Sequence, residues 1–336
     1  MTQQLLEAED LKVYFYTPTG IVKSVNGVSF SVDRGKTLGI VGESGSGKSV
    51  TVSTIMKLVP APGKIISGKI IFKDKDLLKL NEREMLKIRG NEISMIFQDP
   101  MTALNPVFTI GEQIMESIIL HQKLDKKAAQ KKAAETLELV GVPDAELRLK
   151  SYPHEFSGGM RQRAMIAMAI ACNPSLLIAD EPTTALDVTV QAQVLELLKD
   201  LQKRLDMSII LITHNLGVVW EICHDVMVMY AGNAVEHTDT KTLYENPLHP
   251  YTWGLLDSMP KLSYSKETPL NAIEGSPPDL RLVGKGCSFA PRCPYRQQIC
   301  FDETPVLKEI EKGHKVSCHF QDERHRLSRR SVVRNG

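Results

Sequence analysis

Residues 42–49 read Gly42-Glu43-Ser44-Gly45-Ser46-Gly47-Lys48-Ser49. This stretch fits the phosphate-binding loop pattern G-x-x-x-x-G-K-[ST], in which glycines let successive backbone N–H groups converge on phosphate oxygens. Thr37–Val41 before it is typical of a buried strand, and Ser49–Leu58 after it is typical of a helix. A plain glycine turn is the alternative, but the flanking strand and helix favour nucleotide binding. Lys48 would then lie near the terminal phosphates, and the Ser49 hydroxyl would ligate Mg2+.

Composition sets outer limits on the kind of protein. The chain has 336 residues with 41 basic and 40 acidic side chains, a net charge of +1, so bulk charge does not indicate a nucleic-acid or membrane-surface protein. No run approaches the ~18 apolar residues that span a bilayer. Met1–Asp10 is polar and acidic, unlike a signal peptide. We therefore expect a cytoplasmic protein, in which disulfides are the less favoured use of its six cysteines.

Strands alternate with helices between residues 35 and 235, which predicts a mainly parallel sheet covered on both faces. Ahead of this region, alternating apolar residues predict two strands, Leu11–Tyr16 and Val25–Val32. Residues 107–142 have helical periodicity. Further strands are expected at Ser67–Phe72, Ile93–Phe97, Leu176–Asp180, Ser208–Thr213 and Val226–Tyr230, and further helices at Ala164–Ala171 and Val194–Leu205.

Polar side chains follow three of the predicted strands at their carboxyl ends, where parallel sheets bind ligands. Gln98 follows one strand, the carboxylates Asp180 and Glu181 end the next, and His214 follows a third. Asp180 in such a place can hold Mg2+ through water, and Glu181 can orient or deprotonate an attacking water. A strand-end turn with a helix cap is the structural alternative for the carboxylates. A lone His214 would usually be structural, and it gains weight because Gly42, Gln98 and Asp180 also follow strands at this edge.

Two further features are weaker. Ser157-Gly158-Gly159 precedes a helix and offers a second anion site, although alone it would be interpreted as a helix cap. Tyr14, Phe15 and Tyr16 include an aromatic ring that could stack on adenine, but their spacing favours side chains that fill a sheet face.

Together, these segments resemble the ABC ATPases, in matching order and spacing over about 230 residues. The phosphate loop resembles Walker A, and the match extends to a Q-loop glutamine (Gln98), a signature loop (Ser157-Gly158-Gly159), Walker B with its glutamate (Leu176–Asp180, Glu181), a D-loop (Ala185-Leu186-Asp187) and a switch histidine (His214). The signature departs from LSGGQ at Phe156 and Met160 but keeps its serine and glycines.

The resemblance implies an α/β P-loop NTPase fold with a mainly parallel central sheet, an N-terminal antiparallel β subdomain and a helical subdomain at about 99–160, all within residues 1–240. It implies that two such domains sandwich two ATP molecules, and that hydrolysis of ATP reopens the dimer. Implied catalytic residues are Glu181, His214, Gln98 and Lys48, and implied Mg2+ ligands are Ser49, Gln98 and Asp180. The implied nucleotide-binding residues are Phe15, Gly42, Ser44, Gly45, Ser46, Gly47, Lys48, Ser49, Val50, Gln98, Asp180, Ser157, Gly158 and Gly159.

Four cysteines gather near the end of the chain. Cys287, Cys293, Cys300 and Cys318 are separated by five, six and seventeen residues, without the C-x-x-C pairs of zinc ribbons. The spacing leaves open a four-thiolate Fe–S cluster, a four-thiolate zinc site, or unligated structural thiols. The remaining two, Cys172 and Cys223, lie in apolar helical surroundings and are predicted to be buried core thiols.

A tail with His249-Pro250-Tyr251 and four cysteines resembles the C-terminal extension of ATP-binding subunits of dipeptide/oligopeptide and related nickel ABC importers, and the motif Asp99–Pro106 also resembles that group of importers. This resemblance implies a small irregular extension, residues 241–336, with a [4Fe–4S] cluster on the four cysteines, Zn2+ being the alternative. It further implies a peripheral subunit at the cytoplasmic face of the cell membrane that energises peptide uptake. Nickel or another small solute is the alternative cargo.

The implied partners are a second homologous ATPase in a heterodimer, two transmembrane permeases and an extracytoplasmic solute-binding protein, with no nucleic acid. A soluble ABC protein acting on ribosomes or DNA is disfavoured, because two cassettes or a long coiled-coil insertion are absent from the sequence. A redox-responsive regulator, in which the cysteines gate the ATPase, is a third hypothesis.

Overall fold

The computed structural model describes residues 3–98, 103–184, 187–259, 273–321 and 326–327. Two predicted motifs lie partly outside these residues: the D-loop at Ala185 and Leu186, and the motif Asp99–Pro106 at Asp99–Thr102. Contacts between residues group the chain into two compact units. The first comprises Met1–Leu6, Val32–Thr37 and Phe72–Ile212, and the second comprises Glu7–Ser31, Leu38–Ile71 and Thr213–Gly336.

Parallel strands form the centre of the first unit. β7 (Leu176–Asp180) pairs with β6 (Ile93–Ile96) on one side and β8 (Ser208–Thr213) on the other, in parallel register. Every residue of β7 and β8 is buried, as expected for strands covered on both faces. The register matches Ile96 with Ala179, and Asp180 with Ile212, so the strands end together. The predicted convergence of Gln98 and the two carboxylates on one sheet edge is therefore confirmed.

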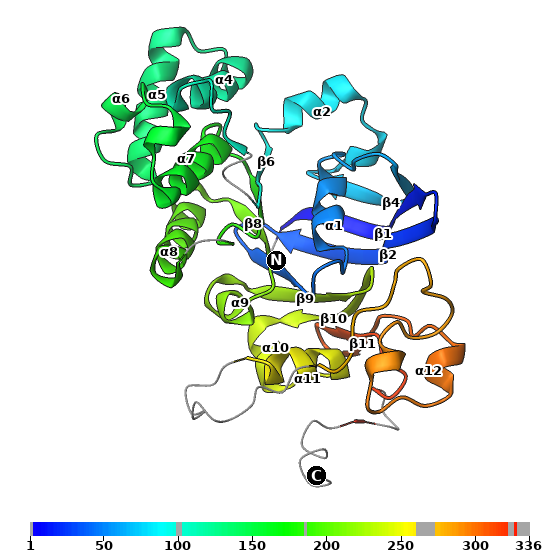
Figure 1. The fold of residues 1–336 in the computed structure, drawn as a ribbon. Helices are drawn as coiled ribbons and strands as arrows, with labels where there is room; N and C mark the ends of the chain where they lie inside the picture. The colour runs from blue at the N-terminus through cyan, green and yellow to red at the C-terminus, as the bar shows by residue number, and fades with distance from the viewer. Residues whose placement is uncertain (1–2, 99–102, 185–186, 260–272, 322–325, 328–336) are drawn as a thin grey trace. The chain divides into compact units, whose positions relative to one another are not determined.

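Helices of the first unit include the predicted helical stretch (Figure 1). The 107–142 region is two helices that break where Lys123 takes a left-handed conformation, φ 55°. Helix α8 starts six residues before the expected Val194, because Asp187 caps it by accepting a 3.0 Å hydrogen bond from Val190 N–H. Its first turn is exposed, so apolar spacing gave no signal there. The helices are α2 (Glu82–Ile88), α4 (Ile110–Gln122), α5 (Lys126–Leu139), α6 (Ala145–Arg148), α7 (Gly158–Ile170) and α8 (Val188–Leu205), with η1 (Leu77–Lys79), η2 (Pro153–Glu155) and the short strand β5 (Lys75–Asp76).

The second unit holds the N-terminal sheet. Strands β1 (Gln4–Thr17) and β2 (Gly20–Asp33) are joined by two residues, as in an antiparallel hairpin, and β4 (Gly63–Phe72) lies beside β1. In β2 the apolar residues Val28, Phe30 and Val32 are buried while the serines between them are exposed. This alternation of period two is the pattern from which the strands were predicted.

Other strands of the second unit carry the phosphate loop. β3 (Thr37–Val41) pairs in parallel with β9 (Asp225–Tyr230), and β9 pairs antiparallel with β10 (Asn233–Asp239). Because β3 is fully buried, it fixes the start of the loop that leads into α1 (Lys48–Ile55). This helix ends at Ile55, slightly before the predicted Leu58.

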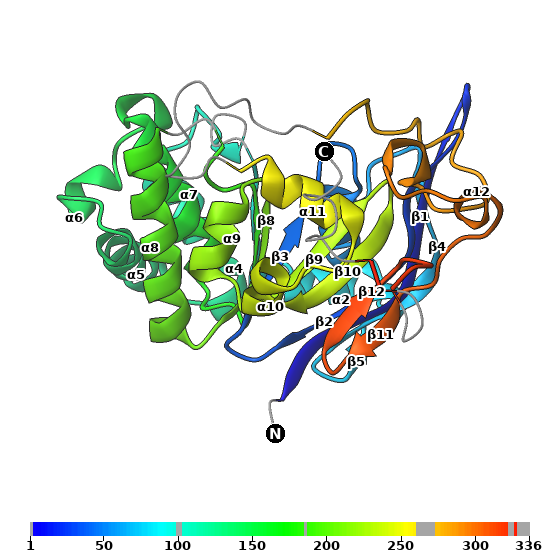
Figure 2. The ribbon, with the colours of Figure 1, turned by 90° about the horizontal axis from the view of Figure 1, so that it is seen from below.

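The tail extends this sheet, which the sequence did not predict (Figure 2). β12 (His314–Val316) pairs antiparallel with β10, and β11 (Lys308–Glu311) pairs with β12. A fully buried carboxylate, Glu236 on β10, accepts hydrogen bonds from Leu248 N–H at 2.6 Å, His249 N–H at 3.0 Å and His314 Nε2 at 2.8 Å. The other elements of this unit are α9 (Leu216–Ile222), α10 (Thr240–Glu245), α11 (Pro250–Asp257), η3 (Ala290–Arg292) and α12 (Ile299–Asp302).

The mixed α/β architecture, with parallel strands, a separate N-terminal sheet and a helical region, is the predicted fold class. Among the described helices, none is long and apolar enough to cross a bilayer. The expected boundary at residue 240 stays a prediction.

Candidate functional site

The phosphate loop of the second unit has a backbone that only glycine permits at two positions. Gly47 has φ 99°, and a Cβ built on it would lie 2.1 Å from the carbonyl oxygen of Ser24. A Cβ on Gly42 would lie 2.1 Å from the carbonyl oxygen of Met229. Gly47 is also the N-cap of α1 and provides no capping side chain. The first N–H groups of the helix are therefore presented by the loop in the manner of an anion site.

Polar side chains of the same loop point inward. Lys48 is 6% exposed, and its Nζ donates hydrogen bonds to the carbonyl oxygens of Gly42 at 2.8 Å and Glu43 at 2.9 Å. Ser46 Oγ is buried and has no hydrogen-bond partner among the described residues. A buried hydroxyl without a partner is costly, and a phosphate oxygen is a chemically suitable partner. The loop therefore fits a nucleoside polyphosphate.

The first unit brings the Q-loop glutamine and the Walker B carboxylates together. Gln98 Nε2 donates a 2.9 Å hydrogen bond to Glu181 Oε2, which also accepts one from Thr184 Oγ1 at 3.0 Å. Glu181 has a left-handed backbone, φ 48°, whereas Asp180 ends β7 with only 7% exposure. A non-glycine residue held in this region stores strain of about 1–3 kcal/mol, and such residues cluster at functional sites. Glu181 is thus oriented by its backbone and by two donors.

The signature segment begins helix α7 of the first unit. Ser157 is the N-cap and accepts a 3.3 Å hydrogen bond from Met160 N–H. Gly158 has open space around its Cβ direction, with no atom within 4 Å. The sequence allowed Ser157-Gly158-Gly159 to be a helix cap or an anion site, and this geometry is compatible with both. Gln162 of the same helix is buried and donates a 2.6 Å hydrogen bond to the Pro182 carbonyl, a support for the Glu181 turn that the sequence did not reveal.

The remaining predicted nucleotide contacts lie in the second unit. His214 is exposed just after β8, and Asn215 next to it caps α9. Of the three N-terminal aromatics, Phe15 is half-buried beside Gly63, Tyr14 Oη donates a 2.9 Å hydrogen bond to Asn26, and Tyr16 is 44% exposed. The roles of His214 and Phe15 stay predictions.

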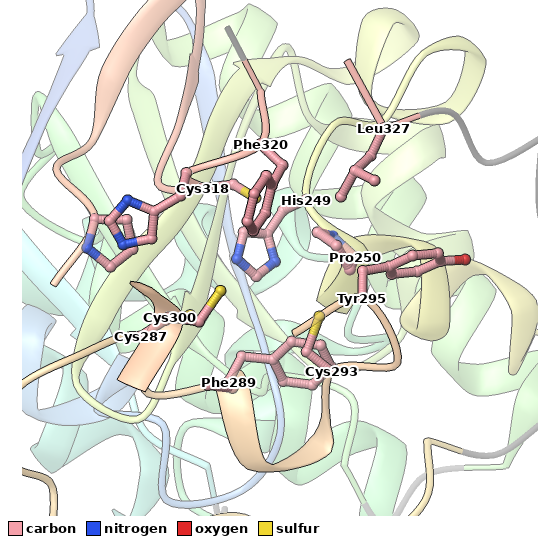
Figure 3. Close-up of a pocket in the computed structure, with 13 residues that line it drawn as sticks. His249, Pro250, Cys287, Phe289, Cys293, Tyr295, Cys300, Cys318, Phe320 and Leu327 are labelled. Atoms are coloured by element: carbon pink, nitrogen blue, oxygen red, sulfur yellow. The ribbon is translucent and has the colours of Figure 1, made fainter. Parts of the chain in front are cut away.

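Four cysteines of the second unit line one cavity. Figure 3 shows Cys287, Cys293, Cys300 and Cys318 with His249 and Phe289 around this space. The pKa of Cys293 is raised to about 11 and that of Cys318 to about 12, mainly by burial and to a smaller extent by the neighbouring cysteines. Burial also lowers the pKa of the His249 imidazole to about 4, so its ring is neutral. The cavity is therefore a poorly hydrated place lined by thiols.

All six cysteines are described, and all are free thiols. Cys172 and Cys223 are buried elsewhere, as predicted for core thiols. Within the described part of the chain, no three His, Cys, Asp or Glu side chains are arranged to hold a metal ion. The four cysteines line one cavity, but among the described residues they are not arranged as metal ligands.

Two family models match the chain. The ABC transporter model matches residues 25–184, and the model of the oligopeptide/dipeptide transporter C-terminal region matches residues 235–300.

Curated proteins match over nearly the whole length. The oligopeptide transport ATP-binding protein OppD of Bacillus subtilis is 56% identical over 314 residues, which cover 93% of this chain and 88% of the relative. The dipeptide transport ATP-binding protein DppD of the same organism is 52% identical and covers 96% of each chain. OppD of Escherichia coli is 51% identical over 94% of this chain and 92% of the relative.

Solved structures agree in fold. The ATP-binding cassette MJ0796, in a dimeric post-hydrolysis state bound to ADP and Pi, matches with a TM-score of 0.63 at 25% identity. The match covers 70% of this chain and 99% of that chain. The CbiO1 subunit of Clostridium perfringens, part of the ABC transporter complex CbiONQ, matches with a TM-score of 0.62.

Proposed function

This chain belongs to the family of ATP-binding subunits of oligopeptide and dipeptide ABC transporters, and we propose that it energises the uptake of di- and oligopeptides. It is an ATPase of the ABC type. The observation that carries the peptide assignment is the presence, in one chain, of the ABC cassette and the oligopeptide/dipeptide C-terminal region. Nickel or another small solute is the second candidate cargo, from the resemblance of the tail to nickel importers.

The phosphate loop binds the triphosphate in this proposal. Backbone N–H groups of residues 42–48 surround the phosphates, Lys48 turns from its carbonyl acceptors toward the terminal phosphates, and Ser46 Oγ gains a partner. Mg2+, ligated by Ser49, Asp180 and Gln98, would neutralise charge on the phosphate oxygens. An aromatic ring, Phe15 by resemblance, would stack on adenine.

Glu181 accepts the proton of the attacking water in this proposal. Its carboxylate is held by Gln98 and Thr184, and a base fixed in this way needs little reorganisation when the reaction occurs. His214 senses the γ-phosphate. The signature residues Ser157, Gly158 and Gly159 contact the ATP bound by the partner ATPase. Closure of the dimer around two ATP molecules and its reopening after hydrolysis then drive the permeases.

The partners that this function requires are a second, homologous ATPase subunit, two transmembrane permeases and an extracytoplasmic solute-binding protein. The chain would act at the cytoplasmic face of the membrane, with no nucleic-acid partner. Reconstitution of the four kinds of subunit in liposomes tests the proposal. ATP-dependent accumulation of a labelled tripeptide supports it. Accumulation of nickel but no peptide would favour the second candidate, and uptake of neither would contradict both.

The four cysteines are the proposed ligands of a [4Fe–4S] cluster, with Zn2+ as the alternative. Their convergence on one apolar cavity supports a four-thiolate site. A bound cluster would tie three segments of the tail together and supply one-electron chemistry. Anaerobic purification followed by iron, sulfide and zinc assays separates the alternatives: about four irons per chain indicates the cluster. One zinc without sulfide would indicate the zinc site.

A further inference from the structure

Glu43 in the phosphate loop is held at its amide, its carbonyl and its carboxylate. Its N–H donates to Tyr251 Oη at 2.9 Å, and its carbonyl oxygen accepts from Lys48 Nζ at 2.9 Å. Its carboxylate accepts two hydrogen bonds from Arg292, from Nη1 at 2.7 Å and from Nη2 at 3.1 Å. Two of these three restraints, Tyr251 and Arg292, come from the C-terminal tail.

Arg292 is itself immobilised. Its side chain is 6% exposed. Its Nε donates to the Glu274 carbonyl at 2.9 Å, and its Nη2 donates to the Ile273 carbonyl at 3.1 Å. The guanidinium carbon also lies 5.9 Å from the centroid of the Tyr230 ring. A planar guanidinium with this many fixed acceptors holds a bidentate carboxylate in one geometry. The position of Glu43 is therefore set by Arg292.

Arg292 belongs to the cysteine-bearing segment. It ends η3, with Cys293 directly after it and Cys287 five residues before it. Backbone hydrogen bonds hold this segment, from Cys287 N–H to the Cys300 carbonyl at 2.7 Å and from Cys293 N–H to the Ala290 carbonyl at 3.2 Å. A shift of either cysteine would thus move the guanidinium.

The aromatic side of the segment makes a second connection. Phe289 lines the cysteine cavity, and its ring lies 5.4 Å from that of Tyr251 and 5.2 Å from that of Tyr230. Tyr251 is the residue that accepts the Glu43 N–H, and it is fully buried. The cavity therefore reaches Glu43 by both a charged and an aromatic path within one compact unit.

We propose that Arg292 is a positioning residue for the phosphate loop, and that through it the four-cysteine segment sets the affinity of the loop for a nucleoside triphosphate. Glu43 places a negative charge in a loop that must accept a polyanion, and Arg292 neutralises that charge. Without Arg292 the carboxylate would repel the phosphates and the loop would lose its side-chain anchor. The inference rests on the proposed binding of ATP by this loop.

Equilibrium titration of the purified 336-residue chain with a fluorescent ATP analogue tests the inference without any need for hydrolysis. Arg292→Ala should raise the Kd about tenfold or more, and the loss should shrink in ~1 M salt, where the screening length is about 3 Å. Arg292→Lys should recover part of the affinity. Arg281→Ala is the matched control, because Arg281 pairs with Asp279 in the same tail at the exposed surface.

The decisive variant is the double substitution Glu43→Gln with Arg292→Ala. If Arg292 acts by neutralising Glu43, removal of both charges should bring the Kd back to within about threefold of the wild-type value. A double variant as weak as Arg292→Ala alone would overturn the charge argument. Thermal unfolding of Arg292→Ala without nucleotide shows whether this variant has a folding defect. Addition of Glu43→Gln would not repair such a defect.

Coupling to the cysteines is tested by Cys293→Ser. This change should alter the nucleotide Kd in the wild-type background and alter it less in the Arg292→Ala background, where only the aromatic path through Tyr251 remains. Equal changes in both backgrounds, or none in either, would overturn the coupling. A wild-type chain that fails to bind the analogue would instead contradict the proposed function, so the two failures are distinguishable.

Discussion

Glu181 Oε2 accepts a 2.9 Å hydrogen bond from Gln98 Nε2, which joins the ends of two neighbouring parallel strands, β6 and β7. The bond orients the carboxylate proposed as the catalytic base, and the left-handed backbone of Glu181 restricts it further. Restraint of this kind is what a general base needs, because its efficiency depends on the geometry of the proton transfer.

Glu181→Gln should lower the ATP hydrolysis rate by at least ~100-fold, because general-base catalysis contributes about 10²–10⁴. The amide keeps the size of the carboxylate, so nucleotide affinity should change little. The measurements are steady-state ATPase activity and the Kd for ATP. Glu196→Gln on the exposed face of α8 is the matched control and should keep full activity. An active Glu181→Gln enzyme would remove this residue from the proposed mechanism.

Gly47→Ala should abolish nucleotide binding. The new methyl group would meet the Ser24 carbonyl at 2.1 Å, and the backbone would be strained at φ 99°. Gly313→Ala is the control that separates backbone strain from the steric clash. Gly313 also has a positive φ, 76°, but no atom lies within 4 Å of the position that its Cβ would take. That control should cost only about 1–2 kcal/mol of stability and leave ATP affinity unchanged. Thermal shift with and without ATP reports both effects, and a normal ATP-induced shift in Gly47→Ala would contradict the role of the loop.

The sequence predicted what depends on local pattern. The phosphate loop and the buried strands follow from glycine spacing and apolar runs, and parallel pairing then brings Gln98 to Glu181. The tail was predicted only as an irregular extension with four cysteines. Its strands β11 and β12 are short and mostly polar, and the hydrogen bond between Glu236 of β10 and His314 of β12 joins residues 78 positions apart in sequence. The Arg292–Glu43 pair joins residues 249 positions apart and has no local signal.

Glu236→Ala should detach the tail from the second unit's sheet. Glu236 is fully buried and satisfies two backbone N–H groups and His314, so its removal leaves three donors unpaired. Each buried donor left without an acceptor costs about 1–3 kcal/mol. Glu311→Ala is the control, because its pair with Arg326 is exposed and is worth at most about 1 kcal/mol. Denaturant unfolding compares the two, and equal midpoints would show that Glu236 is not an anchor.

Cys293→Ser should remove most of the iron and sulfide from anaerobically purified protein. Cys293 lines the cavity shared by the four proposed ligands, and a serine hydroxyl is a poor replacement for a thiolate toward iron. Cys172→Ser is the matched control, because Cys172 is equally buried but belongs to the first unit and does not line the cavity. Iron, sulfide and zinc analysis with the visible absorption spectrum checks the outcome. Equal iron in both variants would show that Cys293 is not a ligand, and the absence of iron and zinc from the wild-type protein would leave the four thiols as structural groups.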